Sequence, residues 1–132
     1  MYHIMARMLL KSMLLCAMLA SALAPAGAWA AELVMFERDG CVWCARWDRE
    51  VGPIYGKTAE AKLLPLRRVN IDRDKPSGVA VNSPVIFTPT FVVMDNGREI
   101  GRITGYINDD AFWGLLGTMV AKLTPPPDPK HT

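Results

Sequence analysis

The order of apolar and polar positions divides residues 31–123 into short segments with strand and helix patterns. Residues 33–36 (LVMF) form a continuous apolar run, which is short enough for a strand buried on both faces. A helical stretch is predicted to begin at the cysteines that follow. Because proline disrupts helical hydrogen bonding, Gly52-Pro53 should interrupt this helix, and residues 54–62 are expected to continue it.

The second half of the pattern contains three more strands. Residues 66–71 (LRRVNI) read as a strand, and residues 79–84 are expected to form a short helix or an irregular connection. A strong apolar run at residues 91–94 (FVVM) is followed by Asn96-Gly97, the strongest short hairpin signal. Residues 99–104 should therefore pair back onto the preceding strand.

A helix is predicted at the C-terminal end of this region. Asn108 or Asp109 can cap it, and acidic residues in its first turn favour the helix dipole. Its apolar positions recur at helical spacing and should pack on the core. These positions are Phe112, Leu115, Leu116, Met119, Val120 and Leu123.

The order of elements is strand, helix, strand, strand, strand, helix. The first three make a βαβ unit, whose crossover connects parallel strands in a right-handed sense. The last three make a hairpin followed by a helix. The predicted fold is α/β, a minimal βαβ-ββα arrangement in which helices flank a four-stranded mixed sheet.

Residues 1–30 have the pattern of a secretory signal peptide. Arg7 and Lys11 precede an uncharged apolar run at residues 12–24, and residues 28–30 (AWA) match a small-residue cleavage site. The run is shorter than the roughly 20 apolar residues of a membrane span. Cleavage after Ala30 and a periplasmic location are predicted, with a retained N-terminal anchor as the alternative.

Composition defines the remaining chain further. Its 132 residues fit one domain, of which residues 124–132 (TPPPDPKHT) are predicted to be a Pro-rich flexible tail. Without Arg7 and Lys11, thirteen of the fifteen basic residues remain and balance thirteen acidic residues. A neutral domain without a basic patch gives no reason to expect nucleic-acid binding. A monomer without a cofactor is expected.

Residues 37–50 (ERDGCVWCARWDRE) hold the only cysteines beyond residue 30, Cys41 and Cys44. Exported proteins meet oxidising conditions, but a disulfide across so short a loop removes little chain entropy. The two cysteines are therefore predicted to take part in thiol chemistry rather than to stabilise the fold. At a helix start the dipole favours a thiolate, which makes Cys41 the expected nucleophile and Cys44, one turn later, the resolving thiol.

Other uses of the cysteine pair are open alternatives. Structural zinc needs four ligands, and beyond residue 30 the chain offers only Cys41, Cys44 and His131, so no metal site is predicted. Two thiolates suffice for Cu(I), so copper carriage is one alternative. An interaction module with a regulatory disulfide is another.

Several segments together resemble the thioredoxin superfamily. The Cys-x-x-Cys pair follows a predicted strand, "TPT" at 88–90 is similar to the cis-proline loop of that family, and "FVVMDNGREIGRITGY" at 91–106 resembles its C-terminal hairpin. The resemblance covers 32–123. More narrowly, residues 35–60 and "PLRRVNID" at 65–72 resemble the periplasmic thioredoxin-like proteins of bacterial Sox (sulfur-oxidation) clusters.

This resemblance implies a thiol–disulfide oxidoreductase that reduces a protein disulfide or a modified cysteine on a sulfur-carrier protein. Electrons would come from a membrane thiol transporter. The resemblance also places Pro89 against the disulfide, where the Thr88 backbone would pair with an extended substrate segment. Trp43 and Trp47 could contact partners around Cys41, or they could simply pack on the core.

The chain departs from the family pattern beneath the second cysteine. The buried acid common in the family falls on Met35 here, while Arg68 matches a basic residue that often accompanies that acid. Glu37 is expected at the surface or pointing elsewhere. The proton acceptor for Cys44 is thus left open among water, Glu37 and the substrate.

Overall fold

A computed structural model describes residues 31–123, so the predicted signal peptide and Pro-rich tail lie outside the described residues. No helix in this range is long and apolar enough to span a membrane. The elements, in chain order, are β1 (Glu32–Glu37), α2 (Val42–Glu50), α3 (Gly52–Tyr55), α4 (Ala59–Leu63), β2 (Leu66–Asn70), β3 (Thr90–Asp95), β4 (Arg98–Thr104) and α5 (Asp109–Val120).

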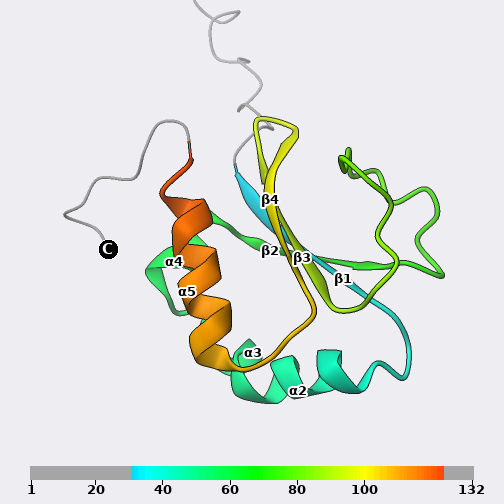
Figure 1. Cartoon of the computed structure of the whole chain (residues 1–132), viewed down its shortest axis with the longest axis horizontal. Helices are drawn as coiled ribbons and strands as arrows, with labels where there is room; N and C mark the ends of the chain where they lie inside the picture. Colours follow the sequence, from blue (N-terminus) through cyan, green and yellow to red (C-terminus); the bar gives the residue numbers. More distant parts are fainter. Residues whose placement is uncertain (1–30, 124–132) are drawn as a thin grey trace, which may run out of the picture.

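The strands form one mixed sheet in the order β2-β1-β3-β4 (Figure 1). β1 pairs in parallel with β2, for example Met35 opposite Arg68, and antiparallel with β3. β3 and β4 form an antiparallel hairpin. This topology confirms the predicted βαβ-ββα arrangement and the four-stranded mixed sheet.

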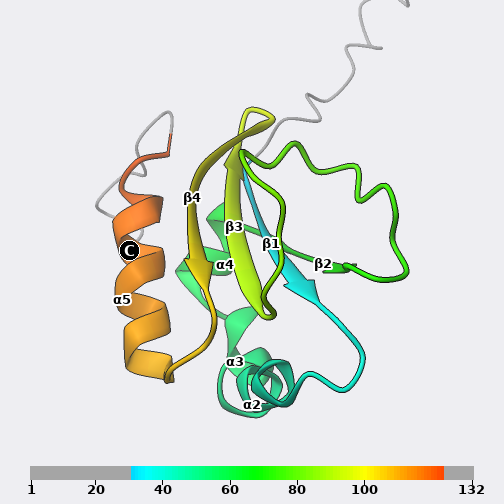
Figure 2. The same ribbon diagram turned by 45° about the vertical axis from the view of Figure 1, so that its right-hand side comes forward.

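The two faces of the sheet are covered differently (Figure 2). Leu33 and Met35 of β1 point into a core built with the helices, whereas Val34 and Phe36 point into a second cluster on the opposite face. That second cluster is covered by the irregular segment 71–89 rather than by a helix. The helices thus lie on one face, and the expected connection at 79–84 takes its irregular form.

The first helical region is interrupted twice, whereas the sequence predicts one interruption. Pro53 lies in the first turn of α3 and separates it from α2, as expected from the missing N–H of proline. A second break follows α3, where the Thr58 side chain accepts a hydrogen bond from the Ala61 N–H and caps α4. The continuous helix expected over 54–62 is therefore wrong.

The hairpin and final helix form where the pattern places them. Asn96 (φ 49°) and Gly97 (φ 74°) both adopt the left-handed conformation that a tight two-residue turn requires. Asn108 caps α5 by accepting a hydrogen bond from the Ala111 N–H. One predicted core position is wrong, since Leu115 is 48% exposed. It lies at the edge of the apolar stripe of α5, on the side turned away from the sheet.

Candidate active site

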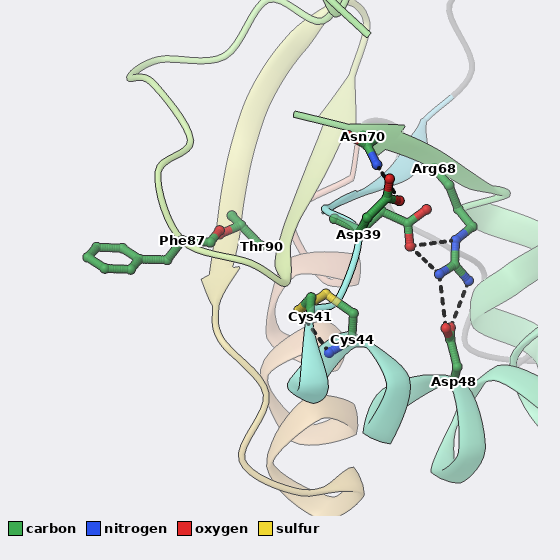
Figure 3. Close-up of a disulfide and its surroundings, with 9 residues drawn as sticks. Asp39, Cys41, Cys44, Asp48, Arg68, Asn70, Phe87 and Thr90 are labelled. Atoms are coloured by element: carbon green, nitrogen blue, oxygen red, sulfur yellow. Dashed lines mark hydrogen bonds and ion pairs between the residues drawn. A yellow bond between two sulfur atoms is a disulfide. The ribbon is translucent and has the colours of Figure 1, made fainter. Parts of the chain in front are cut away.

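Cys41 and Cys44 form a disulfide at the start of α2 (Figure 3). Cys41 is the N-cap residue, and its Sγ accepts a hydrogen bond from the Cys44 backbone N–H at 3.1 Å. The sulfur of residue 41 therefore faces one of the unpaired N–H groups at the positive end of the helix dipole. A helix does begin beneath this sulfur, as the sequence predicts.

The two cysteines differ in their access to solvent. Cys44 is only 4% exposed and belongs to the core on the helix side of the sheet, whereas Cys41 is half-buried at its margin. A partner disulfide can approach residue 41 more directly than residue 44, since the attacked and leaving sulfurs must lie in line in front of the attacking sulfur. The roles of nucleophile for Cys41 and resolving thiol for Cys44 stay predictions, and they require an asymmetry of this kind.

The turn before β3 lies at the same end of the sheet as the start of α2 (Figures 1 and 2). The Thr88–Pro89 peptide bond is cis, Pro89 is buried and Thr88 is half-buried. Gly105, just after β4, donates its N–H to the Pro89 carbonyl at 2.7 Å. The Thr90 hydroxyl donates to the carbonyl of Phe87 at 2.7 Å, which closes the turn.

The two tryptophans of α2 have different environments. Trp43 is 52% exposed beside Cys44, with the Arg46 guanidinium 5.9 Å from the centre of its ring. Trp47 is fully buried, and its ring centre lies 5.3 Å from that of Phe91. The partner contact considered for Trp47 is wrong, because one helical turn carries this side chain from the rim of the site into the core.

A network of charges lies beside the disulfide. Arg68 of β2 donates hydrogen bonds to Glu37 at the end of β1 and to both carboxylate oxygens of Asp48 on α2 (Figure 3). Hydrogen bonds to Glu37 and then Asp48 raise the pKa of Arg68. Met35, which faces Arg68 across the strands, is completely buried. Glu37, expected at the surface or pointing elsewhere, is bound by Arg68 with its side chain 22% exposed.

An open cavity of about 440 Å³ connects this network with the disulfide. Both cysteines line it, together with Glu37 and Asp48. Residues 31–123 contain no group of three or more His, Cys, Asp or Glu side chains placed to hold a metal ion. The arrangement provides a disulfide at a helix start, an open approach to one sulfur and carboxylates within the same cavity.

The model of the thioredoxin-like domain family matches residues 24–119. The chain belongs to the thioredoxin-like family. With its Cys-x-x-Cys pair, this thioredoxin-like protein is a thiol–disulfide oxidoreductase. A comparison with curated protein sequences gives no match.

Solved structures place the thioredoxin-like protein further within the family. The periplasmic thioredoxin SoxS from Paracoccus pantotrophus, in its reduced form, is 43% identical with a TM-score of 0.64, over 67% of this chain and 94% of that one. Trxlp from Edwardsiella tarda is 27% identical with a TM-score of 0.55, over 67% and 84%. Malassezia sympodialis thioredoxin, 18% identical over 68% and 75% with a TM-score of 0.50, shares the fold.

Sequence reasoning missed a second cluster in the thioredoxin-like protein. The Tyr106 hydroxyl donates to Glu50 at 2.6 Å, and Arg46 pairs with Glu50 at 2.8 Å while lying over both Trp43 and Tyr106. The bonds from Tyr106 and Arg46 lower the pKa of Glu50. Burial, followed by the bond to Glu50, raises the pKa of Tyr106. Tyr106 and Glu50 are 56 residues apart in the sequence, so no local pattern predicts their hydrogen bond.

Proposed function

We propose that this protein is a periplasmic reductant in which Cys41 is the nucleophile and Cys44 the resolving thiol. The observation that carries the proposal is the Cys41 sulfur at the start of α2, half-exposed and facing the Cys44 N–H. A thiolate at such a position is stabilised by the helix dipole and by a charge-assisted hydrogen bond. Cys44, at 4% exposure, is suited to attack only after a partner is bound at Cys41.

The exchange proceeds in two steps. The Cys41 thiolate attacks one sulfur of a partner disulfide, so a Cys41–partner bond forms and the partner's second sulfur leaves as a thiolate. Cys44 then loses its proton and attacks the Cys41 sulfur, which expels the first partner sulfur as a thiolate. Two electrons pass to the partner, and the Cys41–Cys44 disulfide remains.

The apolar surroundings of the disulfide support docking of a protein partner. Five of the seven exposed large apolar side chains in the described residues lie at the start of α2, before β3, and between β4 and α5. They are Val42, Trp43, Ile86, Phe87 and Ile107. The ring of Phe87 points away from the disulfide (Figure 3), so the surface would extend beyond it. Within residues 31–123 the Thr88 N–H and C=O have no hydrogen-bond partner, so they are free to pair with an extended segment.

This docking hypothesis has a matched control. Trp43→Ser and Phe87→Ser should raise KM for a protein disulfide about threefold to tenfold, since each buries apolar area on docking. Leu115→Ser removes a similarly exposed side chain from α5, on the helix side and away from Thr88-Pro89, and should leave KM unchanged. Equal effects of Phe87→Ser and Leu115→Ser would refute the docking surface.

A role in sulfur oxidation is the narrower part of the proposal. It is supported by the 43% identity to a periplasmic thioredoxin named SoxS, which is covered over 94% of its length. The proposed substrate is a disulfide or modified cysteine on a sulfur-carrier protein. A membrane thiol transporter is the proposed electron donor, since an oxidising compartment would otherwise keep the pair oxidised.

A trapping experiment tests the partner. Cys44→Ser, expressed in the native host, leaves the mixed disulfide on Cys41 unresolved, and the covalent adduct is isolated under non-reducing conditions. Recovery of a sulfur-carrier protein supports the narrower role, and recovery of apocytochrome c or of a disulfide isomerase refutes it. The Cys41→Ser/Cys44→Ser double variant is the matched control and should trap nothing.

Copper carriage is a competing use of the same two thiols. Thiol titration of the reduced protein with and without a Cu(I) chelator, followed by insulin reduction, separates the two. Turnover of insulin disulfides with freely titrating thiols supports the reductase. Bound copper that protects both thiols, without turnover, would refute it.

A further inference from the structure

The second step of the exchange needs a proton acceptor for Cys44. Cys44 is only 4% exposed, so its thiol meets solvent only through the cavity that it lines, and a thiol must lose its proton before it attacks a disulfide. The side chain on the neighbouring strand, Met35, is apolar and completely buried, and cannot accept that proton. Any acceptor must therefore come from the cavity that Cys44 lines.

Glu37 is placed to reach this cavity. Side chains alternate along β1, so Glu37 lies on the same face of the sheet as Leu33 and Met35, the face that packs on α2. It is the last residue of the strand, and its side chain is 22% exposed. Glu37 and both cysteines line the same cavity of about 440 Å³.

The hydrogen bonds of Arg68 distinguish Glu37 from Asp48. Both bonds to Glu37 end on Oε2, and Oε1 has no hydrogen-bond partner within residues 31–123. Asp48 instead uses both oxygens, Oδ1 at 2.7 Å and Oδ2 at 3.1 Å from Arg68. Of the two carboxylates held by Arg68, only that of Glu37 retains an oxygen free to accept a proton.

The charged groups in the loop after β1, Arg38 and Asp39, have ion-pair partners of their own. Asp39 is 76% exposed, pairs with Arg73 and accepts a bond from Asn70, and Arg38 pairs with Asp72. The charged groups that face Glu37 are Arg68 from β2, Asp48 and Arg49 from α2, and Arg38 and Asp39 from the adjoining loop. Arg68 holds the Glu37 carboxylate at the cavity by two hydrogen bonds and so acts as a positioning residue for it.

We propose that Glu37 accepts the proton of Cys44, held in place by Arg68. In the mixed disulfide, the Cys44 proton passes through the solvent of the cavity to Glu37 Oε1, and the resulting thiolate attacks Cys41. The Cys41–Cys44 bond forms, the bond from Cys41 to the partner breaks, and the partner sulfur leaves with the electron pair. Glu37 then releases the proton to that sulfur or to solvent. This step rests on the exchange reaction proposed above and is independent of the partner's identity.

Ellman's reagent, an aromatic disulfide, separates the two steps in a rapid-mixing experiment between pH 5 and 9. Reduced protein releases the first coloured thiolate when Cys41 attacks and the second when Cys44 resolves the adduct. Glu37→Gln should slow the second phase about 100-fold at pH 7, the lower end of the effect of general base catalysis. The first phase should change less than about threefold, and the deficit should shrink as pH rises because hydroxide replaces the base.

Asp72→Asn is the matched control, since it removes a carboxylate that pairs with Arg38 but does not line the cavity. It should leave both phases within about threefold of the wild type, and Glu37→Asp should retain part of the second-phase rate. Equal second phases for Glu37→Gln and wild type at every pH would overturn the proposal. So would an Asp72→Asn defect as large as that of Glu37→Gln, because the loss would then not depend on a carboxylate at the cavity. A wild-type protein without a first phase would overturn the exchange reaction itself.

Discussion

Reduction of the Cys41–Cys44 disulfide is expected to change the free energy of unfolding only slightly at neutral pH. The bond closes a loop of residues only three positions apart, for which loop closure gives about 2 kcal/mol of stabilisation. A structural staple across a long loop would give more. The oxidised form therefore begins with a small advantage.

The reduced form has an opposing contribution. A Cys41 thiolate at the N-cap keeps the bond from the Cys44 N–H, and a charged acceptor makes such a bond worth about 1.5–3 kcal/mol. The helix dipole adds about 0.3–1 kcal/mol. These contributions match or exceed loop closure when they are complete, above the usual thiol pKa of about 8.5, so at pH 8 the advantage of the oxidised form should be much smaller than at pH 5.

The balance should depend on pH with a definite sign. Folding stabilises the thiolate, so its contribution is present at pH above the ordinary range of thiol ionisation and is lost as pH falls and the sulfur is protonated. At pH 5 the oxidised form should therefore regain an advantage of about 2 kcal/mol, the loop-closure value alone. Stability of the reduced form falls with acid; that of the oxidised form lacks this dependence.

Urea unfolding at pH 5 and pH 8, with and without a phosphine reductant, measures the difference. The fluorescence of buried Trp47 reports unfolding in both forms. Cys41→Ser is the control, and its stability should not respond to the reductant. An oxidised form more stable by over about 4 kcal/mol at both pH values would show that the disulfide is a structural staple, against the reasoning from loop length.

Three further predictions concern the core that supports the site. Gly101→Ala should destabilise by about 1–3 kcal/mol, because a Cβ there would lie 2.6 Å from Met119 Sδ; in a double-mutant cycle measured by urea unfolding, Met119→Ala should relieve part of that loss. Tyr55→Phe removes the 2.7 Å hydrogen bond to the Leu64 carbonyl, worth about 1 kcal/mol. Burial raises the pKa of Tyr55, so its contribution to stability is complete below pH about 10 and declines above it, because the unfolded chain ionises while the folded chain keeps the proton; the variant should flatten this alkaline decline. Trp47→Phe should cost under about 2 kcal/mol in thermal unfolding, against 3–5 for Trp47→Ala, since Trp47 Nε1 is buried without a partner in the described chain and its removal relieves a penalty.

Local signals in the sequence predicted the parts of the fold that depend on neighbouring residues. The run at 33–36 lies in β1, Asn96-Gly97 forms the hairpin turn, and Cys41 is the N-cap residue of α2. Each depends on a strand pattern, a turn conformation or a helix cap within a few positions. The cap at Thr58 is equally local, because a threonine before a run of helix-forming residues is a typical helix start.

Long-range contacts at the site could not be predicted in the same way. The bond from Tyr106 to Glu50 and the bonds from Arg68 to Asp48 join residues 56 and 20 positions apart. Their geometry depends on how α2 packs against the sheet, which no pattern along the chain specifies. The exposure of Leu115 could not be predicted for the same reason. Helical spacing shows which residues share the apolar face of a helix, but not which of them lie at its edge.

The position of the carboxylate in this protein has a physical reason. At Met35, which is completely buried, an ionised side chain would have to be desolvated, whereas a carboxylate at the strand end keeps contact with solvent and with Arg68. Moving the acid by two residues preserves the face of the sheet but leaves the core beneath Cys44 apolar. Partly exposed charges are screened by salt more than buried ones, so proton transfer through Glu37 would respond to ionic strength where a buried acid would not. The core beneath Cys44 is thus apolar, and the proposed base, Glu37, is partly exposed and sensitive to salt.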